Sequence, residues 1–394
     1  MSYPNIILRR GKEESLDRFH PWVFSGAIYS LPENLEEGDI VNVITHDGRH
    51  IGVGHYQIGS IAVRLLHFGE TTINEQFFND RLTQALKLRK ALNLDRDDNT
   101  AYRLVHGEGD FLPGLIVDIY GNTAVVQAHS PGMHFARETI ANALVKLSDI
   151  EIKNVYYKSE TTLPYKAQLD PQNQYLIGGF ETNIAIENGL KFHVDWLKGQ
   201  KTGFFVDQRD NRSLLEHYSK GRKVLNMFCY TGGFSFYAMR GGAELVHSVD
   251  SSAKAITLTN ANVELNFPGD NRHQAFAQDA FKFLDGIGNN DYDLIILDPP
   301  ALAKHRSALK NALRGYQRLN AKAFEKISSG GLLFTFSCSQ AVNKDQFRLA
   351  VFSAAAQTGR KVRILHQLTQ PSDHPINIYH PEGEYLKGLI LYVE

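Results

Sequence analysis

The stretch KVLNMFCYTGGFS, from Lys223 to Ser235, joins a short apolar run to a pair of glycines. An apolar run of this length is typical of a buried strand, and Gly232-Gly233 gives the backbone freedom to turn from that strand into a helix. Apolar strand patterns alternate with helical patterns through the rest of the chain. This repetition predicts an α/β fold, with helices on both faces of a parallel sheet, because parallel strands need crossover connections.

Hydrophobic periodicity places the elements of this region. A hairpin is expected first, at residues 181–196, with Asn188-Gly189 as its turn. The predicted strands are residues 223–228, 243–250, 273–279, 292–298, 330–337 and 361–368. The predicted helices are residues 211–219, 252–265 and 314–328.

Two other regions come before the hairpin. The first alternates short β-rich runs with turns, and Asp47-Gly48 is a strong hairpin signal in it. The second mixes helices expected at 75–92 and 133–147 with a strand at 152–160 and a strand pair turning at Gly121-Asn122. A chain of 394 residues exceeds the size of one hydrophobic core. We therefore predict a β-rich domain (1–72), a central α+β domain (73–178) and the α/β domain (179–394).

Bulk composition narrows the class of protein. The chain is 43% hydrophobic and 22% charged, has no apolar stretch long enough to span a bilayer, and has no signal-peptide pattern at its start. Its two cysteines, Cys229 and Cys338, exclude a disulfide framework and a cysteine-rich zinc site. These features favour a cytoplasmic protein without a metal or a membrane partner. The net charge of -1 gives no argument for nucleic-acid binding.

Polar residues and glycines follow the predicted strands at their carboxyl ends, where open α/β sheets bind ligands. Asp250 is placed to accept hydrogen bonds from ribose hydroxyls, and Asp279 to reach an adenine amine. No G-x-G-x-x-G fingerprint is present, so a nucleoside without a pyrophosphate site is expected, which suggests S-adenosylmethionine. Alternatively, each aspartate is a helix cap and Gly232-Gly233 a plain turn. The ordered series of strand ends favours the cofactor site.

The next two strand ends carry Asp298, followed by two prolines, and Cys338. A thiolate that adds to carbon 6 of a pyrimidine makes carbon 5 nucleophilic enough to take a methyl group. Cys338 would then need a lowered pKa, and Asp298 would bind the ring edge at N3. Alternatively, Cys338 is a small buried hydrophobe, although Ser337 and Ser339 favour a polar pocket. Asp-Pro-Pro is also a common turn, and Cys229 is interpreted as a packing residue.

The motifs VLNMFCYTGGFS, SVDSS, QDAFKFL, LDPPALAK and FSCSQ, with GQKTGFFVDQRDNR and HPEGEYLKG, resemble the bacterial large-subunit rRNA 5-methylcytosine methyltransferases of the I type. The resemblance covers nearly the whole chain. It implies an N-terminal PUA domain, a central α+β domain and a Rossmann-like class I methyltransferase domain. It also implies Cys338 as nucleophile and Asp298 as its assistant. The implied cofactor-binding residues are Gln208, Arg212, Phe228, Tyr230, Gly232, Asp250, Ser251, Asp279, Ala280 and Asp298.

The resemblance implies RNA, 23S rRNA in particular, as the partner, and leaves a homodimer open. Many related RNA enzymes carry a second cysteine after Asp-Pro-Pro, but Ala301 stands there, so another base must release the product. Residues 1–72 hold six Lys or Arg against nine Asp or Glu, so phosphate contacts would depend on a local cluster: Arg9, Arg10, Lys12 and Arg18.

Two other functions are weighed against this one. An exocyclic-amine or guanine methyltransferase would usually place an aromatic residue after the prolines, which Ala301 does not provide. A non-catalytic ribosome assembly factor would not need the cysteine and carboxylate at adjacent strand ends.

Overall fold

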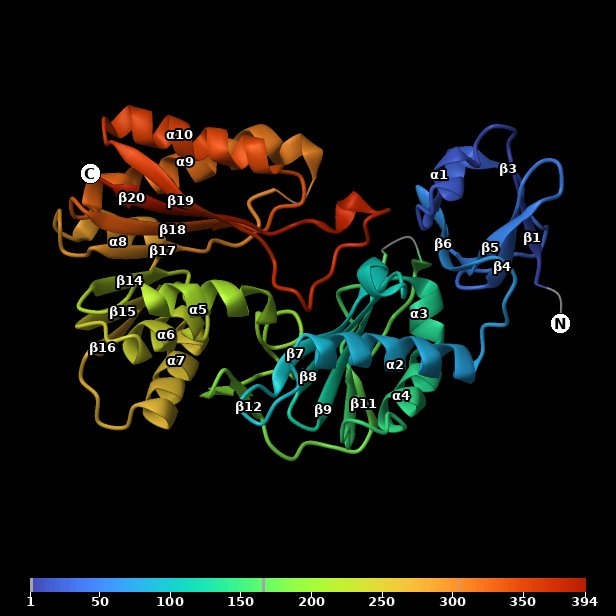
Figure 1. Cartoon of the computed structure of the whole chain (residues 1–394), viewed down its shortest axis with the longest axis horizontal. Coiled ribbons are helices and arrows are strands. Elements are labelled where there is room, and N and C mark those ends of the chain that lie inside the picture. Colours follow the sequence, from blue (N-terminus) through green and yellow to red (C-terminus); the bar gives the residue numbers. More distant parts are fainter. Residues whose placement is uncertain (1–2, 165–166, 304) are drawn as a thin grey trace. The chain divides into compact units, whose positions relative to one another are not determined.

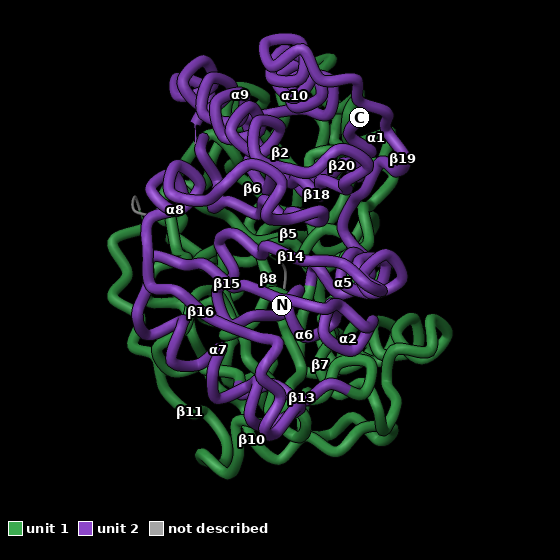
Figure 2. Tube along the Cα trace, turned by 90° about the vertical axis from the view of Figure 1, so that its left-hand side faces the viewer, with its two compact units in different colours: residues 1–189, 194–206, 372–383 green, residues 190–193, 207–371, 384–394 purple. Residues whose placement is uncertain are grey.

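The computed structural model describes residues 3–164, 167–303 and 305–394. The chain divides into two compact units, coloured separately in Figure 2. Unit 1 comprises Met1–Gly189, Val194–Val206 and Ser372–Gly383, and unit 2 comprises Leu190–His193, Asp207–Pro371 and Glu384–Glu394. The segment Ser372–Gly383, which we expected in the α/β domain, thus belongs to unit 1. The two boundaries expected above between the three domains stay a prediction.

The first sheet of unit 1 has six strands in the order β2-β6-β5-β4-β1-β3. The expected hairpin at Asp47-Gly48 joins β4 to β5, and Gly48 has a φ of 90°, which a glycine adopts without strain. Alternate residues of β4 are buried, so one face of the sheet covers the local core. The elements are β1 (Asn5–Leu8), α1 (Glu14–Asp17), β2 (Trp22–Phe24), β3 (Ile28–Ser30), β4 (Ile40–Ile44), β5 (His50–Tyr56) and β6 (Ile61–Phe68).

The second sheet of unit 1 has the order β11-β10-β9-β8-β7, and α2 and α4 pack together beside it (Figure 1). The prediction of a single helix at 133–147 is wrong, because the chain forms two helices that meet at Ala136. The first contacts β5 and the second contacts α2, so the chain must change direction between them. The elements are α2 (Glu75–Ala91), β7 (Ala101–His106), β8 (Leu115–Tyr120), β9 (Thr123–Ala128), α3 (Pro131–Phe135), α4 (Arg137–Val145), β10 (Asn154–Tyr157) and β11 (Gln174–Ile177).

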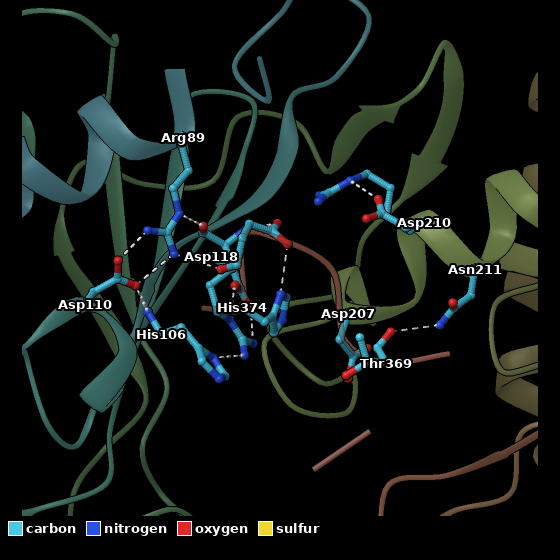
Figure 3. A network of polar contacts seen from close by, with 12 residues as sticks. Arg89, His106, Asp110, Asp118, Asp207, Asp210, Asn211, Thr369 and His374 are labelled. Atoms are coloured by element: carbon cyan, nitrogen blue, oxygen red, sulfur yellow. Dashed lines mark hydrogen bonds and ion pairs between the residues drawn. The ribbon is translucent and has the colours of Figure 1, made fainter. Parts of the chain in front are cut away.

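A buried polar network ties the segment Ser372–Gly383 to the second sheet, within unit 1 (Figure 3). The fully buried Arg89 forms an ion pair with Asp110 through its two terminal nitrogens, Nη1 and Nη2. Nη2 also donates to the carbonyl oxygen of Asp373 at 2.7 Å. The Asp373 carboxylate accepts from the Arg103 backbone N–H at 3.0 Å and lies 2.9 Å from Nδ1 of His374. Arginine suits such a site because its planar fork satisfies several acceptors at once.

We expect Arg89→Met to lower the free energy of unfolding of unit 1 by about 3–5 kcal/mol, because it leaves the buried Asp110 carboxylate without its partner. Chemical denaturation followed by circular dichroism measures this loss. Arg96→Met is the matched control, since Arg96 and Asp98 are partly exposed and their pair contributes at most about 1 kcal/mol. Equal losses in the two variants would contradict the assignment.

Unit 2 is built on a seven-stranded sheet with the order β16-β15-β14-β17-β18-β20-β19. β14 to β18 are parallel, as predicted, whereas β20 lies antiparallel to both of its neighbours. The strand order reverses between β14 and β17, which is the point where open α/β sheets bind ligands. The strands are β14 (Lys223–Met227), β15 (Leu245–Asp250), β16 (His273–Ala277), β17 (Leu294–Leu297), β18 (Gly331–Ser337), β19 (Val362–Leu368) and β20 (Lys387–Val393).

Helices cover both faces of this sheet, as expected. Leu225 and its in-register partner Ile295 share a core with α8, α9 and α10. The neighbouring residue Asn226 points to the opposite face, where it donates to Ser235 of α6 at 2.9 Å. The helices are α5 (Arg209–His217), α6 (Gly233–Arg240), α7 (Ala253–Asn266), α8 (Ala280–Gly286), α9 (Leu309–Lys326) and α10 (Lys344–Thr358). The expected hairpin is also present, as β12 (Ile184–Glu187) and β13 (Leu190–His193).

None of the helices in the described parts of the chain has the length and apolar character needed to cross a membrane.

Candidate active site

The loop after β14 has a backbone that is unusual for its residue types. Phe228, Tyr230 and Gly232 all have positive φ, at 59°, 48° and 85°. Bulky residues rarely adopt this conformation, and such strain is concentrated at functional sites. A Cβ at Gly232 would come within 2.5 Å of the Phe236 ring, so only glycine fits there. All three residues were predicted from the sequence to bind the cofactor, but the strained backbone of Phe228 and Tyr230 was not predicted.

Asp250, at the end of β15, holds this loop in place. One carboxylate oxygen accepts from the Tyr230 backbone N–H at 3.0 Å, and the other accepts from the Ser252 N–H at 2.9 Å. Asp250 is half-buried, and Ser251 beside it is exposed. The carboxylate therefore connects the ends of two neighbouring strands. Each of its oxygens keeps a lone pair that these two backbone N–H groups do not use.

Asp279 caps α8, as the alternative interpretation of the aspartates as helix caps predicted. Its side chain accepts from the Lys282 N–H at 3.0 Å. It is exposed, whereas Ala280, the first residue of the helix, is buried. Both residues lie after β16, at the edge of the sheet that also carries Asp250, since β15 and β16 are parallel neighbours. A contact of Asp279 with an adenine amine stays a prediction.

Asp298 follows β17 and lies next to Gln208 and Arg212. The Gln208 side-chain oxygen accepts from Asn211 at 2.6 Å, which leaves its NH₂ group to donate to the Asp298 carboxylate. The Arg212 guanidinium also stabilises the carboxylate. Burial nevertheless raises the pKa of Asp298 to about 7, and the carboxylate of Asp207 adds to this rise. A carboxyl group with such a pKa can donate a proton near neutral pH.

Arg212 also connects this carboxyl group with the glycine loop. A Cβ at Gly233 would lie 3.1 Å from Cδ of Arg212, so the buried arginine packs directly against the glycine backbone. The residues around the β14 and β17 strand ends therefore include a glycine loop with a buried arginine packed against it, and a carboxylate on the next strand. This arrangement fits a nucleoside cofactor bound at the switch point.

Cys338 follows β18, the parallel neighbour of β17, so its strand end lies beside that of Asp298. The side chain is half-buried, and its Sγ lies 4.0 Å from the carbonyl oxygen of Pro299. The expectation of a lowered thiol pKa is wrong for the chain by itself. Burial raises the pKa of Cys338 to about 12, and the carboxylates of Asp298 and Asp207 add to the rise. A thiolate at this position would therefore need stabilisation by another group.

The two serines beside Cys338 hold the backbone rather than line a polar pocket. Ser337 and Ser339 are fully buried, and each hydroxyl lies 2.9 Å from the hydroxyl of Tyr316 in α9. Ser339 also accepts from the Ala303 N–H at 3.2 Å, which links this strand end to the segment after Asp-Pro-Pro. The other cysteine, Cys229, is buried, and burial raises its pKa, which fits its interpretation as a packing residue.

Two charged residues of the site were not singled out from the sequence. Asp207 accepts from the Tyr385 hydroxyl at 2.7 Å and raises the pKa of Asp298 and of Cys338. Lys387, the first residue of β20, is buried, and its positive charge lowers the pKa of Cys338. Both lie in the quoted motifs GQKTGFFVDQRDNR and HPEGEYLKG. That position in a motif was the signal that could have identified them.

Only one group in the described part of the chain has metal-ligand spacing: His20, His380 and Glu382 of unit 1. Nδ1 of His20 accepts from the Trp22 backbone N–H at 3.2 Å. In a neutral imidazole this places the proton on Nε2, which faces the Glu382 carboxylate at 3.5 Å. A hydrogen-bonded pair is thus favoured over metal ligation, and the absence of a metal site stays a prediction.

Comparison with known proteins agrees with this geometry. A family model described as S-adenosylmethionine-dependent methyltransferase matches residues 142–383, and one described as a PUA-like domain matches residues 6–68. Ribosomal RNA large subunit methyltransferase I of Alteromonas mediterranea is 41% identical over 394 residues, 98% of each chain. The protein of the same name from Shewanella amazonensis is 39% identical and matches 98% of this chain and 99% of its own. The chain belongs to the ribosomal RNA large subunit methyltransferase I family.

Solved structures show the same fold at lower identity. An S-adenosylmethionine-dependent methyltransferase from Streptococcus mutans superimposes with a TM-score of 0.84 at 24% identity, over 99% of this chain and 100% of its own. A methyltransferase crystallised with S-adenosylhomocysteine gives a TM-score of 0.85 at 24% identity, with the same coverage. The predicted fold class and the predicted cofactor, S-adenosylmethionine, are confirmed for this member of the ribosomal RNA large subunit methyltransferase I family.

Proposed function

We propose that the protein methylates carbon 5 of a cytosine in the RNA of the large ribosomal subunit, 23S rRNA in bacteria, through a covalent adduct with Cys338. One observation carries this proposal: the thiol of Cys338 and the carboxyl of Asp298 extend from neighbouring parallel strands, and both are half-buried. The negative charge of Asp298 also raises the pKa of the thiol. A thiol with a carboxyl group on the neighbouring strand end is the pair that the proposed methylation at carbon 5 would use.

The proposed reaction has four steps. The Cys338 thiol first gives its proton to the Asp298 carboxylate. The thiolate then adds to carbon 6, and the electron pair of the 5,6 double bond makes carbon 5 nucleophilic. S-adenosylmethionine, when bound, would supply the electrophilic methyl group that carbon 5 takes, and S-adenosylhomocysteine would leave as the bond from sulfur to that methyl group breaks. Carbon 5 finally loses its proton to water or a basic side chain, and the thiolate leaves carbon 6 as the double bond reforms.

Asp298 suits the target base because it is a proton donor at neutral pH. N3 of a neutral cytosine is a hydrogen-bond acceptor, so an ionised carboxylate would repel it. A carboxyl group with a pKa of about 7 can take up the thiol proton near neutral pH and then donate it to N3. Its proton can bind N3 and stabilise the charge that develops on the ring when sulfur adds.

The cofactor is proposed to lie against the loop after β14. The backbone of Phe228, Tyr230 and Gly232 would contact the cofactor directly, and Asp250 and Ser251 would hydrogen-bond to its ribose. Asp279 and Ala280 would meet the adenine, and Gln208, Arg212 and Asp298 would close the side that faces the target base. These residues follow parallel neighbouring strands or belong to α5 and the turn before it, so they lie at one edge of the sheet.

RNA is proposed as the partner for two reasons. The relatives carry ribosomal RNA in their names, and residues 6–68 match a PUA-like domain. Arg10, Lys12 and Arg18 are exposed, although Arg18 forms an ion pair with Glu14. Few cationic side chains in this module are without an ion-pair partner, so few can bind phosphates. Recognition by shape of a base that is outside a base pair would therefore matter more than phosphate contacts.

Mapping of modified nucleotides in rRNA tests the proposal. A strain without the gene should lack one 5-methylcytosine in the RNA of the large subunit, detected by mass spectrometry, and the plasmid-borne gene should restore it. RNA with 5-fluorocytosine at that position should form a stable covalent adduct with the protein, because fluorine cannot leave carbon 5 as a proton does. Loss of a methylated exocyclic amine or guanine in the deletion strain would overturn the proposal in favour of its nearest rival.

A further inference from the structure

We propose that Lys387 is a positioning residue whose ammonium group is the counterion of the Cys338 thiolate. This inference rests on the proposed role of Cys338 and adds the group that makes its ionisation feasible. Lys387 is the first residue of β20, which pairs antiparallel with β18 so that Lys387 lies directly opposite Ser337. This register places the lysine beside the residue that precedes Cys338.

The contacts of Lys387 fix its amino group close to the end of β18. Nζ donates to the carbonyl oxygen of Ser339 at 2.7 Å and to that of Tyr385 at 2.6 Å. The side chain is 5% exposed, so rotation of the amino group into solvent would break both hydrogen bonds. Ser339 directly follows Cys338, and the lysine is therefore held against the same turn that carries the thiol.

Neutral carbonyls do not compensate the charge of this buried ammonium group. An ammonium has three N–H donors, and two are used by Ser339 and Tyr385, so one remains for an anion. The nearby carboxylate of Glu384 forms an ion pair with Lys344, which is more than half exposed. The thiolate of Cys338 is then the anion that can use the third donor of Lys387.

The charges around the thiol show why a counterion is needed. The carboxylates of Asp298 and Asp207 and burial all raise the pKa of Cys338, to about 12, and Lys387 opposes them. Burial and the positive charge of Lys344 lower the pKa of Lys387 to about 8, while Cys338 and Glu384 act in the opposite direction. Below pH 8 the lysine is charged and favours the thiolate. As the pH rises through 8 this support is lost.

The test measures the reactivity of the thiol, and not methyl transfer. The rate of Cys338 alkylation by iodoacetamide is followed by peptide mass spectrometry of the full chain between pH 6.5 and 10. In Lys387→Met the rate should fall about tenfold at pH 7, because loss of an opposite charge at close range raises a pKa by about one unit or more. The difference should shrink to about twofold by pH 9, where wild-type Lys387 is itself neutral.

Two controls separate charge from structure. Lys387→Arg keeps the charge and should react within about threefold of wild type, and Lys361→Met, which removes an exposed lysine at the start of β19, should not change the rate. A ratio between wild type and Lys387→Met that stays constant from pH 6.5 to 10 would show a structural effect only and overturn the inference. The proposed function fails separately, if Cys338→Ala still transfers methyl groups.

Discussion

Methyl transfer falls by at least about four orders of magnitude in the Cys338→Ala variant, if the thiol is the nucleophile that we propose. Without sulfur no adduct forms at carbon 6, and carbon 5 of a cytosine is too weak a nucleophile to take a methyl group. Cys338 is half-buried at a strand end, so its replacement by alanine removes few packing contacts, and the fold should remain. Single-turnover transfer of a radiolabelled methyl group to the RNA of the large subunit measures the effect.

Cofactor binding distinguishes loss of chemistry from loss of structure. Calorimetric titration of Cys338→Ala with S-adenosylmethionine should give an affinity within about threefold of wild type, because no proposed cofactor contact involves the thiol. The matched variant Cys229→Ala removes the other, buried cysteine and should still form the adduct with 5-fluorocytosine RNA. Transfer by Cys338→Ala at a wild-type rate would instead support an exocyclic-amine methyltransferase.

Asp298→Asn should lower the transfer rate by about 10²–10⁴-fold, the usual contribution of a positioned proton donor. Asparagine keeps the size of the side chain and can still pair with Gln208, but it cannot accept the thiol proton or pass a proton to N3. The loss should therefore appear in the rate of transfer at saturating RNA, with little change in RNA affinity. A variant that transfers at more than a tenth of the wild-type rate would contradict the role of Asp298.

The pH profile of the same variant gives a second, independent result. In the wild type the rate should rise up to pH 7, because below that value both Asp298 and Cys338 hold a proton. Above pH 7 the pair shares one proton, so the rate levels, and it should fall above pH 8 as Lys387 loses its charge. In Asp298→Asn the thiol ionises alone, so the rate should continue to rise tenfold per unit through pH 7. Single-turnover rates between pH 5.5 and 9.5 measure both profiles.

The parallel part of the unit 2 sheet was predictable because its signal is local. Each strand from β14 to β18 is a short run of four to seven residues with apolar residues in it, and predicted helical periodicity separates β15 from β16 and β17 from β18. Chain order then placed Asp250, Asp298 and Cys338 at one edge, since the carboxyl ends of parallel strands coincide. The weaker predictions concerned what each side chain does there. Asp279 caps a helix, and Ser337 and Ser339 bind Tyr316 instead of facing a pocket.

The antiparallel strand β20 and its lysine could not be found in the same way. β20 enters between β18 and β19, and nothing in its seven residues shows which strands it will join. The segment before it, Ser372–Gly383, belongs to unit 1 through Arg89 and Arg103, more than 250 residues away in the chain. Pairings over such distances depend on the whole core and leave no periodic pattern in the sequence.

The amino-acid sequence by itself determined the order of the parallel strands of unit 2, the class of cofactor and the position of Asp298 and Cys338 at adjacent strand ends, because each depends on residues close together in the chain. Only the tertiary structure decided the ionisation of those groups. Burial and the carboxylate of Asp207 raise the pKa of both Cys338 and Asp298, and Lys387, which is far from Asp207 in the chain, lowers the pKa of Cys338. Electrostatic energies vary with distance in space and with desolvation, and neither exists until the fold has formed.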